Sequence, residues 1–199
     1  RALVRRLIDL QANYRQEESR LSSGEKDAWV IQDLTVHAEY LKARIQATEE
    51  EIQNFINQTS GLKANQELLV SISGVGKKTS ARLMGEIGDI SRFENAPQLA
   101  AYAGLNPKGF SSGSSVHKKT RISKQGRSEL RACLYMPAIV AMTHNPVVRA
   151  LKERLQKRQL PTMAIIAACM RKLLHIVYGV LKSQRPFDPD YDRQFNYSA

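Results

Sequence analysis

Apolar residues in the first third of the chain recur with the spacing of a coiled coil. Between residues 31 and 55 the steps alternate between three and four, which is the 3.5-residue period of a coiled-coil seam. The seam consists of Ile31, Leu34, Ala38, Leu41, Ile45, Thr48, Ile52 and Phe55. Ser22 and Glu25 have the spacing of a capping box, so we expect this helix to begin near residue 25. Gly61 is a plausible stop, which puts the end of the helix near residue 58.

A less regular form of the same pattern occupies the first twenty residues. Its apolar positions are Leu3, Leu7, Leu10, Tyr14 and Leu21, with Glu17 in the gap. The two patterns predict a long coiled-coil helical hairpin over residues 1–60. The second helix would be roughly 50 Å long at 1.5 Å per residue, so it should pack on the first helix, on another copy, or on both. The strict alternation favours a homodimer or a higher oligomer; two helices of an ordinary bundle are the alternative.

The rest of the chain reads as short helices separated by turns. We expect them near residues 64–72, 77–88, 96–103, 126–143, 147–158 and 162–182. Pro137 should kink or split the helix that contains it. No helical period appears between Gly104 and Gln125, where the alternation around Val116 and Ile122 suggests one short strand. The prediction is therefore an all-α protein with a compact helical domain over 61–183 and a flexible tail over 184–199.

Charge divides the chain and indicates the partner. The net charge is +11, yet residues 1–70 carry nine Lys/Arg against eleven Asp/Glu, a net of −2. Residues 71–199 carry twenty-one against eight, a net of +13, which predicts that this part binds a polyanion. A hydrophobic fraction of 42% argues against disorder.

Cysteine usage and the ends of the chain suggest where the protein works. Cys133 and Cys169 lie in apolar helical patterns, as buried thiols of a reducing cytoplasm do. No run of 18 unbroken apolar residues is present, so we expect no membrane partner. The chain begins at Arg1 within a helical pattern and without a methionine, which suggests a piece of a longer protein.

The segment "LLVSISGVGKKTSARLMGEIG" contains a first candidate nucleic-acid contact. Gly74 and Gly76 flank one apolar residue between two helical patterns, as in a helix-hairpin-helix motif. Glycines allow a tight turn and a close approach, and amides at a helix start attract phosphate, with Lys77 and Lys78 adding charge. A nucleotide-binding P-loop fails because Ser71 and Lys78 stand where glycine and Ser/Thr are needed. A tight turn that binds nothing remains an alternative.

The second candidate is the stretch "FSSGSSVHKKTRISKQGR". Its serines are Ser111, Ser112, Ser114 and Ser115, and its cations are Lys118, Lys119, Arg121, Lys124 and Arg127. The combination suggests a hydroxyl delivered to a polyanion from a flexible loop; a solvated connector is the alternative. Arg131, Arg171 and Lys172 lie on the following helices and face either phosphates or solvent.

An ordered set of motifs carries a family resemblance. The set is "GDISRF…AYAGLNP…SSGSS…ISKQGRSELR…LYMPA…MRKLL". With the preceding coiled coil, it resembles the C-terminal transposase domain of the insertion sequence 110/116/902 family. The resemblance implies a prokaryotic, DNA-associated enzyme, guided by an RNA, that recombines DNA through a serine–phosphate linkage. It matches the family's serine to Ser112, directly before Gly113, with Ser111, Ser114 and Ser115 as alternates.

The resemblance also implies a divided active site. The family's full-length enzymes carry an N-terminal domain with four acidic residues that bind magnesium, and this chain has no such region, no metal site and no cofactor of its own. A serine hydroxyl needs activation, which would then come from that domain. His117 is a lone histidine and a weak candidate base. We therefore expect this chain alone to bind DNA or RNA without cleaving it. The alternative function is a non-catalytic helix-hairpin-helix module that binds nucleic acid and dimerises.

Overall fold

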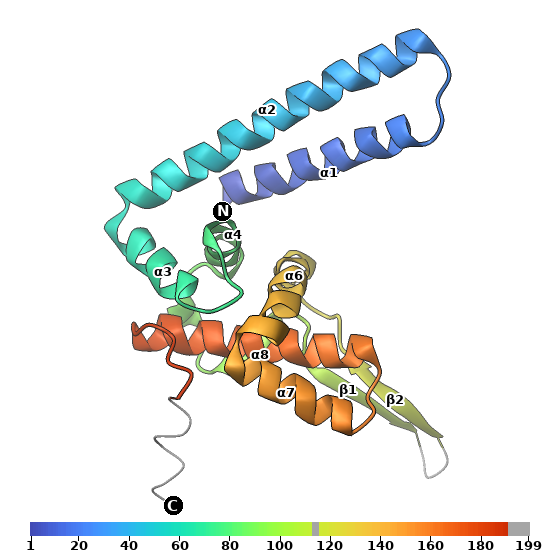
Figure 1. Cartoon of the computed structure of the whole chain (residues 1–199). Coiled ribbons are helices and arrows are strands. Elements are labelled where there is room, and N and C mark those ends of the chain that lie inside the picture. Colours follow the sequence, from blue (N-terminus) through green and yellow to red (C-terminus); the bar gives the residue numbers. More distant parts are fainter. Residues whose placement is uncertain (113–115, 191–199) are drawn as a thin grey trace, which may run out of the picture. The chain divides into compact units, whose positions relative to one another are not determined.

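The chain folds into two units, which are described separately. A computed structural model describes the backbone of residues 1–112 and 116–190. It describes the side chains of the same residues except those between 109 and 121. Unit 1 runs from Arg1 to Lys63 and unit 2 from Ala64 to Ala199. Helices dominate both units, and the prediction of an all-α protein is confirmed, with one two-stranded sheet added in unit 2 (Figure 1).

Unit 1 is an antiparallel hairpin of α1 (Ala2–Ser22) and α2 (Ala28–Gln58) (Figure 1). In the middle of α2 the buried residues are those of the predicted seam, namely Ala38, Leu41, Thr48 and Ile52. At the ends the seam shifts by one position. Phe55 is exposed while Ile56 is buried, and Leu3 is exposed while Val4 is buried. A straight helix has 3.6 residues per turn, so a 3.5-residue pattern drifts around it and the contact residue changes toward the ends.

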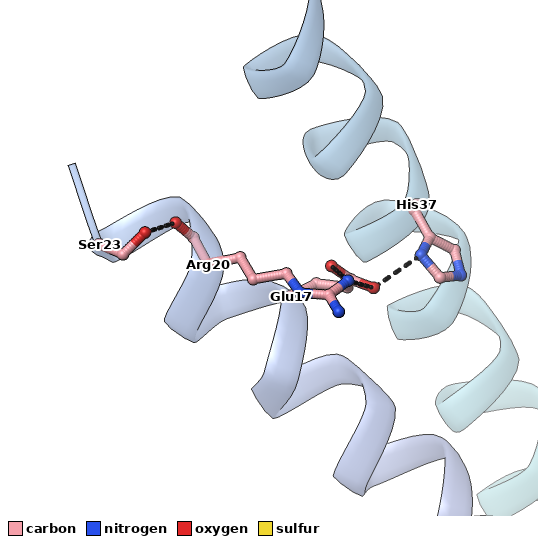
Figure 2. Close-up of polar contacts among 4 residues, drawn as sticks. All are labelled: Glu17, Arg20, Ser23 and His37. Atoms are coloured by element: carbon pink, nitrogen blue, oxygen red, sulfur yellow. Dashed lines mark hydrogen bonds and ion pairs between the residues drawn. The ribbon is translucent and has the colours of Figure 1, made fainter. Parts of the chain in front are cut away.

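A polar cluster interrupts the apolar seam of the hairpin (Figure 2). Glu17, the gap in the sequence pattern, is 6% exposed. Its carboxylate accepts hydrogen bonds from Arg20 Nη1 at 3.1 and 3.2 Å, and its Oε1 lies 3.1 Å from His37 Nδ1 on α2. A polar group in a helical seam favours the one register that satisfies it. Glu17 and His37 therefore fix how α1 and α2 are aligned.

The start of α2 differs from the prediction. Ser22 is the last residue of α1, and its hydroxyl donates to Ser19 O, so it cannot cap the next helix. Asp27 is the N-cap instead, and its Oδ1 accepts from the amides of Trp29 and Val30 at 2.9 and 3.1 Å. The predicted capping box was therefore wrong, because Ser22 still belongs to α1 and Asp27, an equally good type of cap, lies directly before the next helix.

Unit 2 contains the remaining elements in this order: α3 (Ser60–Val70), α4 (Lys77–Ile87), η1 (Ile90–Arg92), α5 (Ala96–Tyr102), β1 (Pro107–Ser112), β2 (Val116–Ile122), α6 (Ser128–His144), α7 (Pro146–Lys157) and α8 (Thr162–Ser183). Two expectations are corrected. Gly61 lies in the first turn of α3, which begins directly after the extended Thr59, and does not end the preceding helix. Pro137 does not split α6, which continues to His144.

Helix α8 is the centre of the core of unit 2. Its buried residues include Cys169, Leu173, Leu174 and Val177, and it packs against α5, α6 and α7. Among the described residues it is the one helix long and apolar enough to cross a membrane, with a mean hydropathy of 1.7, and half of that stretch is buried within the protein. Its apolar character is therefore explained by its place in the core.

The segment after α8 is partly held against the domain. Gln184 Nε2 donates to Asn65 Oδ1 at 3.0 Å, and the Phe187 amide donates to Ser71 Oγ at 2.8 Å. The Phe187 side chain packs on the core. The start of the predicted flexible tail thus has tertiary contacts that its polar sequence did not indicate, and residues 191–199 lie outside the described part of the chain.

Candidate nucleic-acid interface

The serine-rich stretch forms a strand hairpin where a flexible loop was expected. β1 pairs with β2 in antiparallel register, with Ser112 opposite Val116 and Ser111 opposite His117. We call these two strands (residues 107–112 and 116–122) the arm, and Figure 1 shows both strands extending away from the helices. Lys118, Lys119 and Arg121 belong to β2, whereas Ser114 and Ser115 lie outside the described residues. Ser112 is thus the last residue of β1, at the far end of the arm from the helices.

The arm stands on a backbone clamp, which we call the arm base (residues 102–106 and 123–127). Three amides on one side donate to three carbonyls on the other: Ser123 to Asn106 at 2.8 Å, Lys124 to Gly104 at 3.0 Å, and Arg127 to Tyr102 at 2.7 Å. Gly126 has a φ of +144°, and a Cβ there would overlap Tyr102 O. Only glycine allows the two sides to come this close.

Arg127 fastens the arm base to the core. Its Nη2 and Nε donate to Glu86 Oε2 at 2.6 and 3.2 Å, and Glu86 is 1% exposed. The hydrogen bond to Glu86 raises the pKa of the Arg127 guanidinium above its ordinary value. The guanidinium also lies 6.0 Å from the centre of the Tyr102 ring, within cation–π range. The structure therefore gives Arg127 contacts within the protein that the sequence did not indicate, and its predicted phosphate contact stays a prediction.

Two further arginines brace the entry to β1. Arg131 Nη1 donates to Ala103 O at 3.0 Å, and Arg171 Nη1 donates to Asn106 Oδ1 at 2.7 Å. Both side chains are half-buried. Glu86 and Asn106 were missed as site-supporting residues. Their signals were a carboxylate within the apolar pattern of α4 and an asparagine in the "AYAGLNP" motif.

The turn between α3 and α4 has an inner and an outer glycine. Gly74 has a φ of +105°, and a Cβ there would meet Ala141 Cβ and Pro137 O at 3.0 Å, so its close approach is to α6. Gly76 is the N-cap of α4, and a Cβ there would enter open space. Lys77 and Lys78 follow it and are exposed. The outward anion contact predicted for this motif is therefore geometrically open at Gly76 and closed at Gly74.

Other basic residues lie on the surface of unit 2. Lys124 is exposed at the arm base with a φ of +55°, and α7 adds the exposed Arg149, Arg154 and Lys157. Figure 1 shows the α3–α4 turn well apart from the far end of the arm. The two predicted contacts are thus separate places on one basic unit.

Neither the two cysteines nor a metal cluster gives the described residues a reactive group. Burial raises the pKa of the Cys133 thiol to about 12 and that of Cys169 to about 11, so both are unreactive at neutral pH. Among residues 1–112 and 116–190, no group of three or more His, Cys, Asp or Glu is placed to hold a metal ion.

Comparison with known proteins gives the family. Residues 66–153 match the model of the transposase IS116/IS110/IS902 family, and the chain belongs to this family, as the sequence resemblance predicted.

Individual relatives extend the match beyond that segment. The pilin gene-inverting protein of Moraxella bovis is 43% identical over 141 residues, which are 70% of this chain and 44% of the relative. The protein of the same name from Moraxella lacunata matches equally well. An uncharacterized 44.8 kDa protein of insertion element IS116 from Streptomyces clavuligerus is 30% identical over 169 residues, 83% of this chain and 41% of the relative. The chain therefore spans less than half the length of these relatives.

Proposed function

We propose that this chain is the C-terminal part of a DNA transposase or site-specific recombinase of an insertion sequence, and that Ser112 is its nucleophile. The observation that carries the proposal is the position of Ser112 as the last residue of β1, on an arm with a clamped base. A hydroxyl that must meet one phosphorus atom gains from such a support, because positioning supplies much of the rate in phosphoryl transfer. The names of the Moraxella relatives, which describe gene inversion, support a recombinase.

The reaction is an exchange of one phosphoester for another. The Ser112 Oγ forms a bond to phosphorus while the bond from phosphorus to a deoxyribose oxygen breaks. The hydroxyl proton passes to a base or to water, and the leaving oxygen takes up a proton. Negative charge grows on the non-bridging oxygens during the step, and the basic sequence of β2 (Lys118, Lys119 and Arg121) favours binding of that charge.

In this proposal the magnesium ion is supplied by a different domain from the one that carries Ser112. The described residues offer no cluster of metal ligands. If the full-length protein carries the acidic domain that the family resemblance implies, that domain would supply the ion. The ion would favour the ionised form of the serine hydroxyl. This chain supplies the serine, the basic surface and contacts to DNA and to a guide RNA.

Nucleic-acid binding is assigned to the outer side of the α3–α4 turn and to the exposed cations of unit 2. The open N-terminus of α4 at Gly76, with Lys77 and Lys78 beside it, suits a phosphate. Contacts of this kind hold the backbone without reading its sequence. A helix-hairpin-helix turn would therefore contribute binding to any nucleic-acid sequence. The choice of target would belong to the guide RNA.

Substitution of the serine in the full-length protein tests the proposal. Ser112→Ala should abolish recombination and the covalent protein–DNA adduct while DNA binding stays intact. Ser111→Ala is the matched control, since it removes the neighbouring hydroxyl in the same strand and should leave the adduct in place. Unchanged recombination by Ser112→Ala would leave only a nucleic-acid-binding module. Strand cleavage by this chain alone with magnesium would refute the need for a second domain.

A further inference from the structure

One exposed arginine of unit 2 lies over a pair of aromatic rings. Arg92 is the last residue of η1, and its guanidinium carbon is 5.6 Å from the centre of the Phe93 ring and 6.0 Å from that of the Tyr102 ring. The two rings pack edge to face with their centres 5.3 Å apart. We call Arg92 and the two rings the arginine platform. Tyr102 is also the first residue of the arm base, so the platform adjoins the support of the arm.

Contacts with the core hold the platform in place. Phe93 is 4% exposed and belongs to the core, and Tyr102 packs against the core. The Tyr178 hydroxyl of α8 donates a hydrogen bond that is shared between Glu94 O at 2.8 Å and Phe93 O at 3.2 Å. A guanidinium is planar, and one that already lies against fixed rings loses little further freedom when it binds a ligand.

Arg92 differs from the arginines at and beside the arm base in having hydrogen-bond donors left over. Arg127 donates to Glu86, and Arg131 donates to Ala103 O. In the part of the chain whose side chains the structure describes, no acceptor is bonded to the Arg92 guanidinium. Because the side chain is also exposed, its N–H donors are available to a ligand from solvent.

A second cation and one carboxylate lie near the platform. Asp89 accepts hydrogen bonds from the Ser91 hydroxyl at 2.7 Å and the Ser91 amide at 2.8 Å. These two bonds, and after them the positive charges of Arg92 and Lys182, lower the pKa of Asp89. Arg92 and Lys182 thus lie near one carboxylate whose oxygens already have partners in their own turn. Positive charge is in excess here, which favours an anionic ligand.

A flat guanidinium with unused donors matches a phosphate group. Arginine binds phosphate through two parallel N–H···O bonds, and stacking on an aromatic ring leaves the edge of the guanidinium open for them. If Ser112 attacks DNA as proposed, the neighbouring arm brings a DNA backbone close to the platform. A backbone phosphate is then the ligand that fits this chemistry.

The length of the arm separates this phosphate from the one that Ser112 attacks. Ser112 is the last of the six residues of β1, which span roughly 20 Å at about 3.3 Å per residue. Phosphates of one DNA strand recur about every 3.4 Å along the helix axis. A phosphate on the platform therefore lies several nucleotides away from the one at Ser112.

From these observations we propose that Arg92 binds a backbone phosphate of a DNA duplex several nucleotides from the cleaved bond. The contact sets the position of the duplex relative to the arm and carries no base information. The identity of the ligand rests on the proposed function, whereas the arginine platform itself does not.

Binding of this chain to a labelled DNA duplex over a salt series tests the contact. Arg92→Ala should weaken binding by about tenfold and make the negative slope of log binding constant against log salt less steep by roughly 0.9. Arg92→Lys keeps the charge and should keep the slope. It should recover only part of the affinity, because lysine binds phosphate as a point charge.

The matched control is Arg6→Ala, which removes the same charge from an exposed position of unit 1 and should change neither affinity nor slope. An unchanged affinity and slope of Arg92→Ala would overturn the inference and leave the proposed function in place. A wild-type chain that binds no duplex would overturn both.

A variant that keeps the charge tests the role of the rings. Phe93→Leu removes one of the two rings that the guanidinium lies over and keeps an apolar side chain in the core. It should weaken binding by roughly two- to fivefold with an unchanged slope. Thermal unfolding of each variant checks that unit 2 is folded. A folded Phe93→Leu with wild-type affinity would show that stacking does not prepare Arg92 for phosphate.

Neutral phosphate analogues locate the contact on the DNA. In the full-length protein bound to its recombination site, methylphosphonates introduced one at a time should weaken wild-type binding at a position several nucleotides from the cleaved bond. Arg92→Ala should be insensitive at that position alone, because the two changes remove the same interaction. Identical profiles for the two proteins would overturn the assignment. A defect of Arg92→Ala that is equally large with single-stranded RNA or with inorganic phosphate would also overturn it, because the ligand would then be RNA or a free ion.

Discussion

Predicted nucleic-acid contacts lie both around the arm base, at Arg127 and Arg131, and at the α3–α4 turn, yet the structure uses the cations of these two regions in opposite ways. Arg127 of the arm base, with Arg131 of α6 and Arg171 of α8, donates to acceptors within the protein. At the turn, the glycine that packs inward is Gly74, and Lys77 is exposed beside the open Gly76. A basic sequence therefore contains two kinds of cation, those that are bonded within the protein and those that are exposed to solvent.

The difference follows from what each region must hold. A two-stranded hairpin is marginally stable alone, so its base needs tertiary contacts, and arginine can reach several acceptors at once. A turn between two packed helices is already held by their apolar faces. Lys77 is then exposed to solvent.

The largest expected effect is the loss of the Arg127–Glu86 ion pair. Arg127→Ala deprives a carboxylate that is 1% exposed of this partner, which typically costs about 3–5 kcal/mol in the free energy of unfolding. Urea denaturation of unit 2 measures it. The double variant Arg127→Met with Glu86→Gln is the control and should recover most of the loss, because no buried charge remains. Full stability of Arg127→Ala would mean that the arginine faces a ligand after all.

The second largest expected effect is a difference in stability between substitutions of the two glycines in the α3–α4 turn. Gly74→Ala places a Cβ 3.0 Å from Ala141 Cβ at a positive φ, and we expect a loss of about 2 kcal/mol or more in the free energy of unfolding. Gly76→Ala meets open space and should cost at most about 1 kcal/mol, as a weaker N-cap. Thermal unfolding of both variants measures the difference. Equal losses would show that the inner and outer roles are misassigned.

The helical hairpin of α1 and α2 was predictable from sequence because the spacing of apolar residues that specifies it lies within each helix. A 3.5-residue period needs only one helix to be read, and Ala38, Leu41, Thr48 and Ile52 are buried as expected. β1 was missed because "PKGFSS" has no alternation and gains its structure from pairing with β2 and from the clamp below it. Strand formation depends on such neighbours more than on intrinsic preference.

The candidate site was predictable only in part. The resemblance singled out Ser112, and the charge pattern singled out the basic part of the chain. The role of Arg127 could not be predicted, because its partner Glu86 lies 41 residues away and nothing in the spacing relates them. The division of the two glycines likewise depends on α6, which packs against Gly74 from a distant segment.

A smaller effect is expected at the contact between Arg171 and Asn106. Either Arg171→Ala or Asn106→Ala removes a 2.7 Å charge-assisted hydrogen bond, worth about 1.5 kcal/mol in the free energy of unfolding. Each variant should speed hydrogen exchange of the Ser123 amide, which donates to Asn106 O. The Val148 amide, which bonds to the cap residue Asn145, is an internal reference and should not change. Unaltered exchange at Ser123 in both variants would show that the side chains do not brace the arm.

The smallest effect concerns binding and leaves stability untouched. Lys77 is exposed at the open end of α4, so Lys77→Ala should make the negative slope of log binding constant against log salt less steep by roughly 0.9 on duplex DNA, the amount for one phosphate contact. Lys63→Ala removes the same charge from unit 1 and should leave the slope unchanged, because that unit carries no net positive charge to hold the backbone. Fluorescence anisotropy with a labelled duplex over a salt series gives both slopes. An unaltered slope for Lys77→Ala would make the turn a structural connection, like the arm base, and would move the phosphate contacts to other cations of unit 2.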